Sequence, residues 1–514
     1  PSAIAVVLLS CCNVSFKFLG SIITTSNPFC CNERARVMPA KAPPHIMISV
    51  FNLYSSVYKT VLFFTDNMTI LGMQIPENIK SLSASDIGQL LHKRKICPID
   101  LVNFYFDEID SFTKPSPYVL LTKERALSEA ILSKKRLLEE NPLSPLDGVP
   151  VAWKDLFDFK GCITTSGSRI LENNSPANKD AEVVNLAKKA GIVQLGKTST
   201  VEFALGGIGT NSNFVTPENA IMKDVPRVPG GSSSGSGVAL ANGLCAASFG
   251  TDTGGSVRIP SAWNKLVGFK TSIGRISLKG VSPLAISYDT VGPLTKSIKD
   301  ASLLFSILTS SPYLGFEKIN HSNIKILVVR GMPWIDIDHQ IEKACEEAFI
   351  NLSKAGINIV EKEMYEIEEM HKLLAENNGG TTIAEAYLEW KNLVDKFGSL
   401  MDKDVLNRML RGKEMEKKSL NSIYNAEESL SKSLHISIDN YDAILMPTIP
   451  ILPPTIQKVE NDRKTYDSFN SLALRNTRIA NSLRLCAISL PLPEKHPIGI
   501  MLCKALNKDE ELLN

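Results

Sequence analysis

The chain has 514 residues, 44% hydrophobic and 21% charged, and its 31 glycines and 28 prolines are too few for a disordered or collagen-like protein. Its 56 basic and 54 acidic side chains give a formal net charge of +2, so we expect no direct nucleic-acid binding through a broad basic surface. No apolar run of about 18 or more residues follows residue 70, so we expect no membrane span in the body of the chain.

The first 75 residues differ from the rest of the chain and predict an N-terminal extension outside the fold. The apolar stretch Ile4–Leu9 precedes Ser10-Cys11, as in an export signal, but no basic region comes before it. We therefore favour a cytoplasmic protein with one large domain over residues 76–514, and Met68 and Met73 are candidate start sites. Removal of residues 1–67 is expected to leave activity and solubility unchanged.

Regular structure begins near Ser81 and alternates between helices and short apolar strands. Ser83-Ala-Ser-Asp precedes apolar residues and predicts a capped amphipathic helix, and helical periodicity continues over 101–112 and 124–140. The segment 146–157 is short and apolar and carries one central lysine. A helix over 181–190 then leads to a strand at 192–196, and this alternation predicts an α/β fold.

The second half of the chain continues the alternation. Strands are expected at 324–329, 357–360 and 443–446, and helices at 339–354 and through most of 366–435. No internal repeat or low-complexity linker divides the sequence, so we expect a single large domain.

Cysteines and histidines are not arranged for metal binding. Six of the 10 cysteines lie beyond residue 75 without a CxxC pair, and the 7 histidines form no HxH or HxxxH pair. We therefore expect reduced, mostly buried thiols of a cytosolic protein, no metal site and no cofactor.

A glycine- and serine-rich segment from Gly230 to Val257 carries the clearest chemical signal. It holds six serines and one charged residue, and it predicts a flexible glycine loop, an Ala/Leu-rich helix and a second glycine turn that opens into a helix at Ser256. Glycines let backbone N–H groups converge on a small volume, and a helix N-terminus adds partial positive charge. The segment therefore suits the stabilisation of an anion or an oxyanion.

Other glycine-loop motifs fit this segment less well. A Walker phosphate loop needs a lysine that is absent after Gly235 and Gly237, and a dinucleotide loop needs a third glycine. Gly231-Ser-Ser-Ser-Gly matches the nucleophile elbow GxSxG, but that motif follows a strand, and here Pro226 and Pro229 precede it. A solvated Ser/Gly linker is disfavoured because the flanking residues are apolar and almost uncharged.

Six segments, taken in their order along the chain, resemble the amidase signature family. They are Gly148-Val-Pro-Val-Ala-Trp-Lys-Asp, Gly196-Lys-Thr-Ser-Thr-Val-Glu-Phe-Ala, Gly230-Gly-Ser-Ser-Ser-Gly-Ser, Thr251-Asp-Thr-Gly-Gly-Ser-Val-Arg-Ile-Pro, Val267-Gly-Phe-Lys-Thr-Ser-Ile-Gly-Arg-Ile-Ser and Asp289-Thr-Val-Gly-Pro-Leu. The resemblance covers roughly residues 80 to 513. It implies a single large twisted mixed β-sheet wrapped by helices, with the glycine loops over the active site.

The resemblance also implies a catalytic Ser–cis-Ser–Lys triad. At the matching positions the lysine is Lys154, the cis-serine is Ser232 and the nucleophile is Ser256. Burial of Lys154 in its apolar segment would lower its pKa, so that the neutral amine could accept a proton relayed by Ser232. A lysine on the solvent face of a strand is the alternative interpretation.

The resemblance assigns further roles around the nucleophile. The oxyanion would be held by the backbone N–H groups of four successive residues: Thr253, Gly254, Gly255 and Ser256. Three more residues are expected to support the loops, with plain structural hydrogen bonding as the alternative role: Ser233, Asp252 and Arg258.

Two functions fit this family. One is an amidase that hydrolyses the linear carbon–nitrogen bond of a small-molecule carboxamide through an acyl-enzyme, with a homodimer as one option for its assembly. The other is the A subunit of a tRNA-dependent amidotransferase, which releases ammonia from glutamine beside a B-subunit partner. That subunit usually carries a paired-Arg, Leu-Gly, Tyr-rich stretch, whereas residues 407–413 read Asn-Arg-Met-Leu-Arg-Gly-Lys and only Tyr424 follows.

The segment Ser287-Tyr-Asp-Thr-Val-Gly is also closer to general amidases, so we favour the hydrolase. An inactive scaffold would need a broken triad, and all three residues are present. The acyl group is left open, because the residues that set specificity fall in the variable region 312–470.

Overall fold

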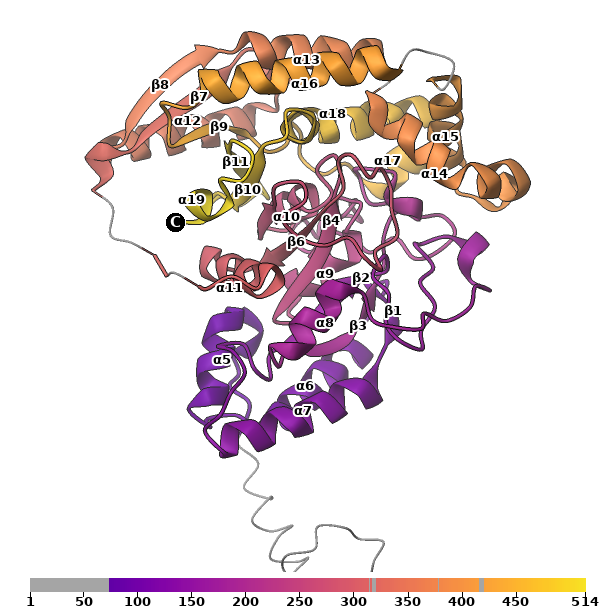
Figure 1. Ribbon diagram of the computed structural model, residues 1–514, viewed down its shortest axis with the longest axis vertical. Coiled ribbons are helices and arrows are strands. Elements are labelled where there is room, and N and C mark those ends of the chain that lie inside the picture. Colours follow the sequence, from indigo (N-terminus) through magenta and orange to yellow (C-terminus); the bar gives the residue numbers. More distant parts are fainter. Residues whose placement is uncertain (1–73, 314, 317–319, 378, 416–419) are drawn as a thin grey trace, which may run out of the picture. The chain divides into compact units, whose positions relative to one another are not determined.

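The computed structural model describes residues 74–514 except 314, 317–319, 378 and 416–419, and these residues belong to one unit, Met73–Asn514 (Figure 1). The apolar stretch and the candidate start sites lie outside the described residues. The N-terminal extension therefore stays a prediction.

One mixed β-sheet of 11 strands runs through the described part of the chain. In the order in which they lie side by side, the strands are β1 (Tyr118–Leu121), β3 (Val193–Thr198), β2 (Pro150–Lys154), β4 (Ala247–Asp252), β6 (Thr290–Thr295), β5 (Val267–Lys270), β10 (Cys486–Pro491), β11 (Gly499–Lys504), β9 (Ala443–Pro447), β7 (Lys325–Arg330) and β8 (Asn358–Glu363). β2 is parallel to β3 and β4, β7 is parallel to β8 and β9, and the other neighbouring pairs are antiparallel. The predicted α/β fold with one large mixed sheet is confirmed.

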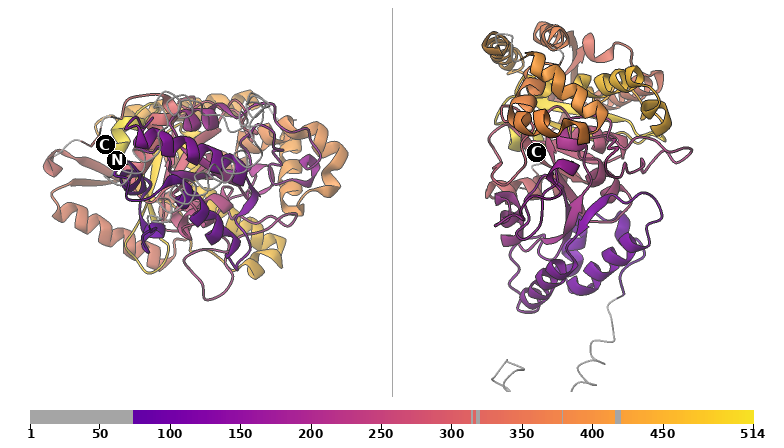
Figure 2. Two further views of the ribbon diagram at one scale, coloured as in Figure 1. Left: turned by 90° about the horizontal axis from the view of Figure 1, so that it is seen from below. Right: turned by 90° about the vertical axis from the view of Figure 1, so that its right-hand side faces the viewer.

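Helices pack against both halves of this sheet. They are α5 (Ala84–His92), α6 (Pro98–Asp110), α7 (Lys123–Leu138), α8 (Glu182–Lys189), α9 (Ser234–Ala241), α10 (Arg258–Trp263), α11 (Ile298–Thr309), α12 (His339–Lys354), α13 (Tyr365–Glu376), α14 (Thr381–Phe397), α15 (Lys403–Met415), α16 (Leu420–Ser437), α17 (Ile456–Glu460), α18 (Arg463–Ser482) and α19 (Asp509–Leu513). Figure 1 and Figure 2 show α5, α6 and α7 at one end of this unit and α13 to α16 at the other.

Local sequence signals explain where several elements begin. Ser83 and Asp86 form a capping box at the start of α5, because each side chain accepts a hydrogen bond from the other residue's backbone N–H. Pro98 is the first residue of α6, where its missing N–H costs no helical hydrogen bond. β2 and β3 are buried at every position, as expected for parallel strands covered on both faces.

The glycine- and serine-rich segment differs from its prediction in two ways. α9 begins at Ser234, so Gly235 and Gly237 lie in a buried helix rather than in a flexible loop. A Cβ on Gly235 would lie 2.4 Å from the Pro117 carbonyl oxygen and 2.5 Å from the Ser199 nitrogen, so only glycine allows this close packing. β4 was not predicted: three of its six residues, Ala247, Gly250 and Asp252, are of types that strands disfavour, and its place between β2 and β6 decides its conformation.

A separate hydrophobic cluster forms one side of the region around Ser256. In it, buried residues of α14 and α15 pack against 203–205 and against 284–288. Residues 203–205 come from the first half of the chain, and 284–288 and the two helices come from the second half, so the packing joins distant parts of the sequence.

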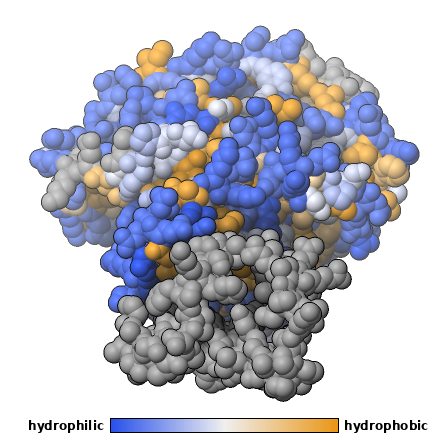
Figure 3. Space-filling view, turned by 60° about the horizontal axis from the view of Figure 1, so that its bottom comes forward, coloured by the Kyte–Doolittle hydropathy of each residue, from blue (hydrophilic) through white to orange (hydrophobic). Residues whose placement is uncertain are grey.

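The mixed polarity of the surface and the free cysteines are as the composition predicts. Figure 3 shows hydrophobic residues scattered among hydrophilic ones on the visible face. Along the described residues, we find no helix with the length and apolar character that crossing a membrane requires. All six described cysteines are free, and four of them are buried, as predicted: Cys245, Cys345, Cys486 and Cys503.

Candidate active site

Lys154 is the last residue of β2, and its side chain is fully buried at 0% exposure. Its Nζ donates hydrogen bonds to Ser232 Oγ at 2.7 Å and to Thr251 Oγ1 at 2.8 Å. Burial lowers the pKa of Lys154 to about 7, although the nearby charges of Asp289 and Asp252 oppose the shift. The interpretation as a solvent-facing strand lysine is therefore wrong.

Ser232 lies two residues before the start of α9, follows a cis Gly231–Ser232 peptide bond, and is fully buried. Its carbonyl oxygen accepts hydrogen bonds from the Val201 N–H at 3.1 Å and from Thr200 Oγ1 at 3.0 Å. The loop that follows β3 therefore holds the Ser232 backbone beside the end of β2, where Lys154 reaches its hydroxyl.

A buried ion pair fixes the turn between β4 and α10. Arg258 Nη2 donates to Asp252 Oδ1 at 2.8 Å, and both side chains are 0% exposed. The same carboxylate accepts the N–H groups of Gly255 at 2.9 Å and Val257 at 3.1 Å. Burial alone would raise the pKa of Asp252, but the charge and hydrogen bonds of Arg258, with a hydrogen bond from Asn481, hold it well below its usual range.

Ser256 lies in this turn, between β4 and α10, and is 4% exposed. Its carbonyl oxygen accepts the Ser233 N–H at 3.2 Å, which joins the turn to the segment that carries Ser232. Ser256 Oγ makes no hydrogen bond to any described residue. The structure therefore brings the two serine segments together through the backbone, without a recorded hydrogen bond between the Ser232 and Ser256 hydroxyls.

The backbone N–H groups around Ser256 are not equivalent. The Gly255 N–H already donates to Asp252, whereas those of Thr253, Gly254 and Ser256 donate to no group in the described part of the chain. The oxyanion set implied by the family resemblance thus has three unengaged donors rather than four. Gly255 instead has φ +132°, a conformation that favours glycine.

Two side chains close to Lys154 had no predicted role, although both begin segments that the family resemblance singled out. Thr251 bonds Lys154 directly. Asp289 accepts a hydrogen bond from Thr253 Oγ1 at 2.5 Å and others from the backbone of Leu284 and Ala285. Burial raises the pKa of Asp289 to about 6, although these hydrogen bonds and the Lys154 charge oppose the shift.

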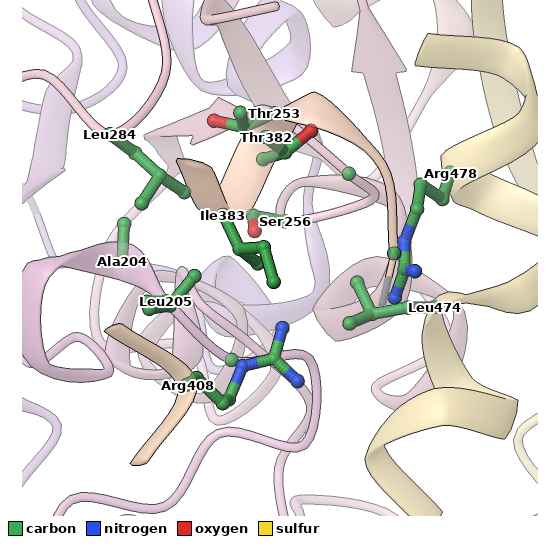
Figure 4. Close-up of a pocket in the computed structure, with 13 residues that line it drawn as sticks. Ala204, Leu205, Thr253, Ser256, Leu284, Thr382, Ile383, Arg408, Leu474 and Arg478 are labelled. Atoms are coloured by element: carbon green, nitrogen blue, oxygen red, sulfur yellow. The ribbon is translucent and has the colours of Figure 1, made fainter. Parts of the chain in front are cut away.

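A pocket opens at Ser256 and receives residues from both halves of the chain (Figure 4). Its apolar wall is formed by five side chains: Ala204, Leu205, Leu284, Ile383 and Leu474. Two arginines, Arg408 of α15 and Arg478 of α18, also line it. Neither arginine had a predicted role. Arg408 lies in the segment 407–413 that was compared with the amidotransferase subunit, whereas Arg478 lies in no motif, and the two meet only through the packing of separate helices.

Clusters of metal-binding side chains are a separate question. Across residues 74–514, outside the undescribed gaps, no group of three or more His, Cys, Asp or Glu side chains is arranged to hold a metal ion.

Comparison with known proteins identifies the family. The family model described as Amidase matches residues 100–513. The chain is 32% identical to 2-amino-5-chloromuconic acid deaminase of Comamonas testosteroni, over 83% of this chain and 92% of that protein. It is 30% identical to mandelamide hydrolase of Pseudomonas putida, over 85% of this chain and 91% of that protein.

This chain is also similar to one subunit of an amidotransferase and to an amidase of known structure. The A subunit of glutamyl-tRNA(Gln) amidotransferase from Methylacidiphilum infernorum is 29% identical over 84% of this chain and 92% of its own length. A crystal structure described as an amidase superposes with a TM-score of 0.75 at 28% identity, covering 84% of this chain and 98% of that one. The chain therefore belongs to the amidase family and is a hydrolase of carbon–nitrogen amide bonds.

Proposed function

We propose that this enzyme hydrolyses the carboxamide of a small molecule, with Ser256 as nucleophile, Ser232 as proton relay and Lys154 as base. The contact between the Lys154 Nζ and the Ser232 Oγ, 2.7 Å apart, carries the proposal. A lysine with its pKa near 7 is available as a neutral amine at neutral pH, and only the neutral amine accepts a proton.

The proposed reaction begins when Ser256 Oγ attacks the amide carbonyl carbon. The Ser256 proton passes to Ser232 Oγ, and the Ser232 proton passes to the lone pair of Lys154 Nζ. Hydrogen bonds of this kind are often longer before substrate binds, which is compatible with the unengaged Ser256 hydroxyl. The relay then returns the proton to the leaving nitrogen as the carbon–nitrogen bond breaks.

Water completes the cycle. It attacks the acyl-enzyme ester, loses its proton to the same relay, and releases the carboxylic acid together with free Ser256. The net reaction converts an amide and water into an acid and an amine or ammonia.

We assign the oxyanion to the backbone N–H groups of Thr253, Gly254 and Ser256. The choice rests on their lack of partners among the described residues, since an engaged donor cannot turn toward the substrate. We give Asp252 and Arg258 the task of holding the turn, because the Asp252 carboxylate already binds the Gly255 N–H. Ser233 joins the turn to the relay segment through its N–H.

The alternative function is that of the glutamine-hydrolysing A subunit of a tRNA-dependent amidotransferase, beside a B-subunit partner. The similarity to such subunits, at 29% identity over 84% of the chain, keeps it as the second candidate. The proposed stand-alone amidase is located in the cytoplasm, and its amidase signature domain spans residues 76–514.

Substitution of Ser256 by alanine tests the proposed nucleophile. We expect kcat to fall by about 10⁴-fold or more with the fold retained, because no neighbouring group can attack the amide carbonyl carbon in place of Ser256 Oγ. In intact-mass spectra, a fluorophosphonate should add once to the wild type and not to the variant.

Ser261→Ala is the matched control. Ser261 lies in α10 and its Oγ bonds only the Val257 carbonyl at 2.8 Å, so labelling and activity should persist. Unchanged turnover in Ser256→Ala, or stoichiometric labelling of that variant, would show that the nucleophile is another residue.

A further inference from the structure

Two cavities of different size adjoin the residues around Lys154 and Ser256. The pocket at Ser256 has a volume of about 30 Å³, while a second cavity, which Thr251 and Asp289 line, has a volume of about 220 Å³. A single water molecule needs about 10–15 Å³ of such space, so the first pocket has room for little more than a carboxamide group. The second cavity has room for a larger group but has no role in the proposed reaction.

The larger cavity is mostly apolar. Of the described residues that line it, only Thr251, Ser282 and Asp289 are polar, and the others carry aliphatic side chains. The Asp289 carboxylate already accepts hydrogen bonds from Thr253 Oγ1 and from the Leu284 N–H. Such a cavity suits an alkyl or aryl group, which needs no hydrogen-bond partner.

The position of the larger cavity relates it to the nitrogen side of a bound amide. Thr251, which lines the cavity, accepts a hydrogen bond from the Lys154 Nζ at 2.8 Å. In the proposed relay, Lys154 and Ser232 return a proton to the leaving nitrogen, so that nitrogen must face them. A substituent on the nitrogen would therefore extend toward the larger cavity, and the acyl chain would extend away from it.

Leu284 separates the two cavities. Among the described residues it is the only one that lines both, and it is 4% exposed. Figure 4 shows its side chain directed toward Ser256 and Ile383. A bulky substituent on the amide nitrogen would therefore meet Leu284 before it reached the larger cavity.

Hydrogen bonds on both sides hold the backbone of Leu284 in this position. Its N–H donates to Asp289 Oδ2 at 2.9 Å. The carbonyl oxygen of the preceding residue, Pro283, accepts the indole N–H of Trp390 in α14 at 3.0 Å. A movement of the backbone that withdrew Leu284 would break these hydrogen bonds, so the side chain forms a fixed partition.

We infer that Leu284 is a specificity-determining residue: it keeps the nitrogen side of the substrate out of the larger cavity, so that the enzyme hydrolyses primary carboxamides. This rests on the proposed function of Ser256, Ser232 and Lys154. The reaction converts a primary carboxamide and water into a carboxylic acid and ammonia, and the leaving NH₂ group takes the proton that the relay returns. The larger cavity becomes a site for an alkyl or aryl amine once the Leu284 side chain is shortened.

The test compares amides that differ in which side of the carbonyl carries a chain. A screen of primary amides first identifies the acid whose amide the wild type hydrolyses best, and its N-butyl amide is then compared with an isomer. The isomer is a primary amide whose acyl chain carries the additional butyl carbons, so both substrates contain the same atoms. We expect the wild-type kcat/KM to be lower for the N-butyl amide by about 100-fold or more.

Leu284→Ala should raise kcat/KM for the N-butyl amide by about 10- to 100-fold relative to that for the isomer. Each methylene group that enters an apolar site contributes about a four-fold factor, and a butyl chain offers several. Intrinsic reactivity cancels, because the same two substrates are compared in every variant. Leu284→Val, a smaller change, should raise the ratio in the same direction by a smaller factor.

Leu474→Ala is the matched control. Leu474 is also buried and lines the pocket at Ser256, but it does not line the larger cavity. Its truncation can alter both kcat/KM values, yet their ratio should stay within a few-fold of the wild-type ratio.

A second measurement uses no turnover. In the Ser256→Ala background, the N-butyl amide should raise the melting temperature when Leu284→Ala is also present, and it should not do so when Leu284 is intact. Where Leu284→Ala fails to fold, Leu284→Val in the same background gives the same comparison.

The outcomes separate the inference from the function on which it rests. An equal or higher wild-type kcat/KM for the N-butyl amide would overturn the inference while leaving the amidase intact. An unchanged ratio in both Leu284 variants, or an equal rise in Leu474→Ala, would overturn it as well. A rise for the longer acyl chain instead would show that the acyl side faces the larger cavity. Absence of primary-amide hydrolysis together with absence of fluorophosphonate labelling at Ser256 would overturn the proposed function itself.

Discussion

Replacement of the buried Lys154 by methionine should abolish activity and, in acid, stabilise the fold. The pKa of Lys154 is lowered from 10.5 to about 7 by burial, and the side chain is 0% exposed. Since one pKa unit corresponds to about 1.36 kcal/mol, this shift disfavours the charged lysine in the native state by about 5 kcal/mol. Methionine has a similar length and carries no charge to desolvate.

The stability of the wild type should depend on pH in a defined direction. Between pH 7 and 10.5 the unfolded chain keeps the lysine proton while the native protein has lost it, so the wild type becomes more stable as pH rises. Below pH 7 both states hold the proton and the full cost is present. The stability advantage of Lys154→Met over the wild type should therefore shrink by roughly 3 kcal/mol from pH 6 to pH 9.

Urea denaturation at the two pH values measures this difference, with the free energy of unfolding obtained by linear extrapolation. A pH-independent difference between the variant and wild type would refute the lowered pKa. In parallel, kcat/KM of the wild type for a neutral amide should rise with pH through about 7 and then level off. Lys154→Arg should stay inactive, because a guanidinium does not accept a proton in this range, and full activity of that variant would exclude Lys154 as the base.

Two further predictions concern the turn that carries Ser256. Gly255→Ala should lower the free energy of unfolding by about 1–3 kcal/mol and reduce kcat/KM, because Gly255 has φ +132° and the new Cβ would lie 2.2 Å from Thr477 Oγ1. Gly254→Ala is the control: its new Cβ would have its nearest contact at 3.6 Å, so in urea denaturation this variant should differ little from wild type. Asp252→Asn should cost about 3–5 kcal/mol by leaving the Arg258 charge buried and unpaired. The double variant with Arg258→Met should recover part of that loss, and strictly additive losses would contradict the coupling.

Local sequence signals were sufficient for the class of fold and for the family. The order of six short motifs identified the amidase family, because their glycines, serines and lysine must meet fixed backbone requirements. The capping box at Ser83 predicted the start of α5, and the alternation of helical periodicity with apolar strands predicted the α/β fold. Both signals can be recognised in the sequence because they act over a few neighbouring residues. The candidate residues Lys154, Ser232 and Ser256 were named from these motifs alone.

Only the tertiary structure decided how these residues are arranged and what surrounds them. β4 is a strand because β2 and β6 lie on either side of it, since half of its residues (Ala247, Gly250 and Asp252) are of types that strands disfavour. The lowered pKa of Lys154 depends on the loss of solvent around one amine, which requires the surrounding elements to be packed. Arg408 and Arg478 meet at Ser256 only because α15 and α18 pack against the first half of the chain, and a linear sequence carries no mark of such a long-range contact.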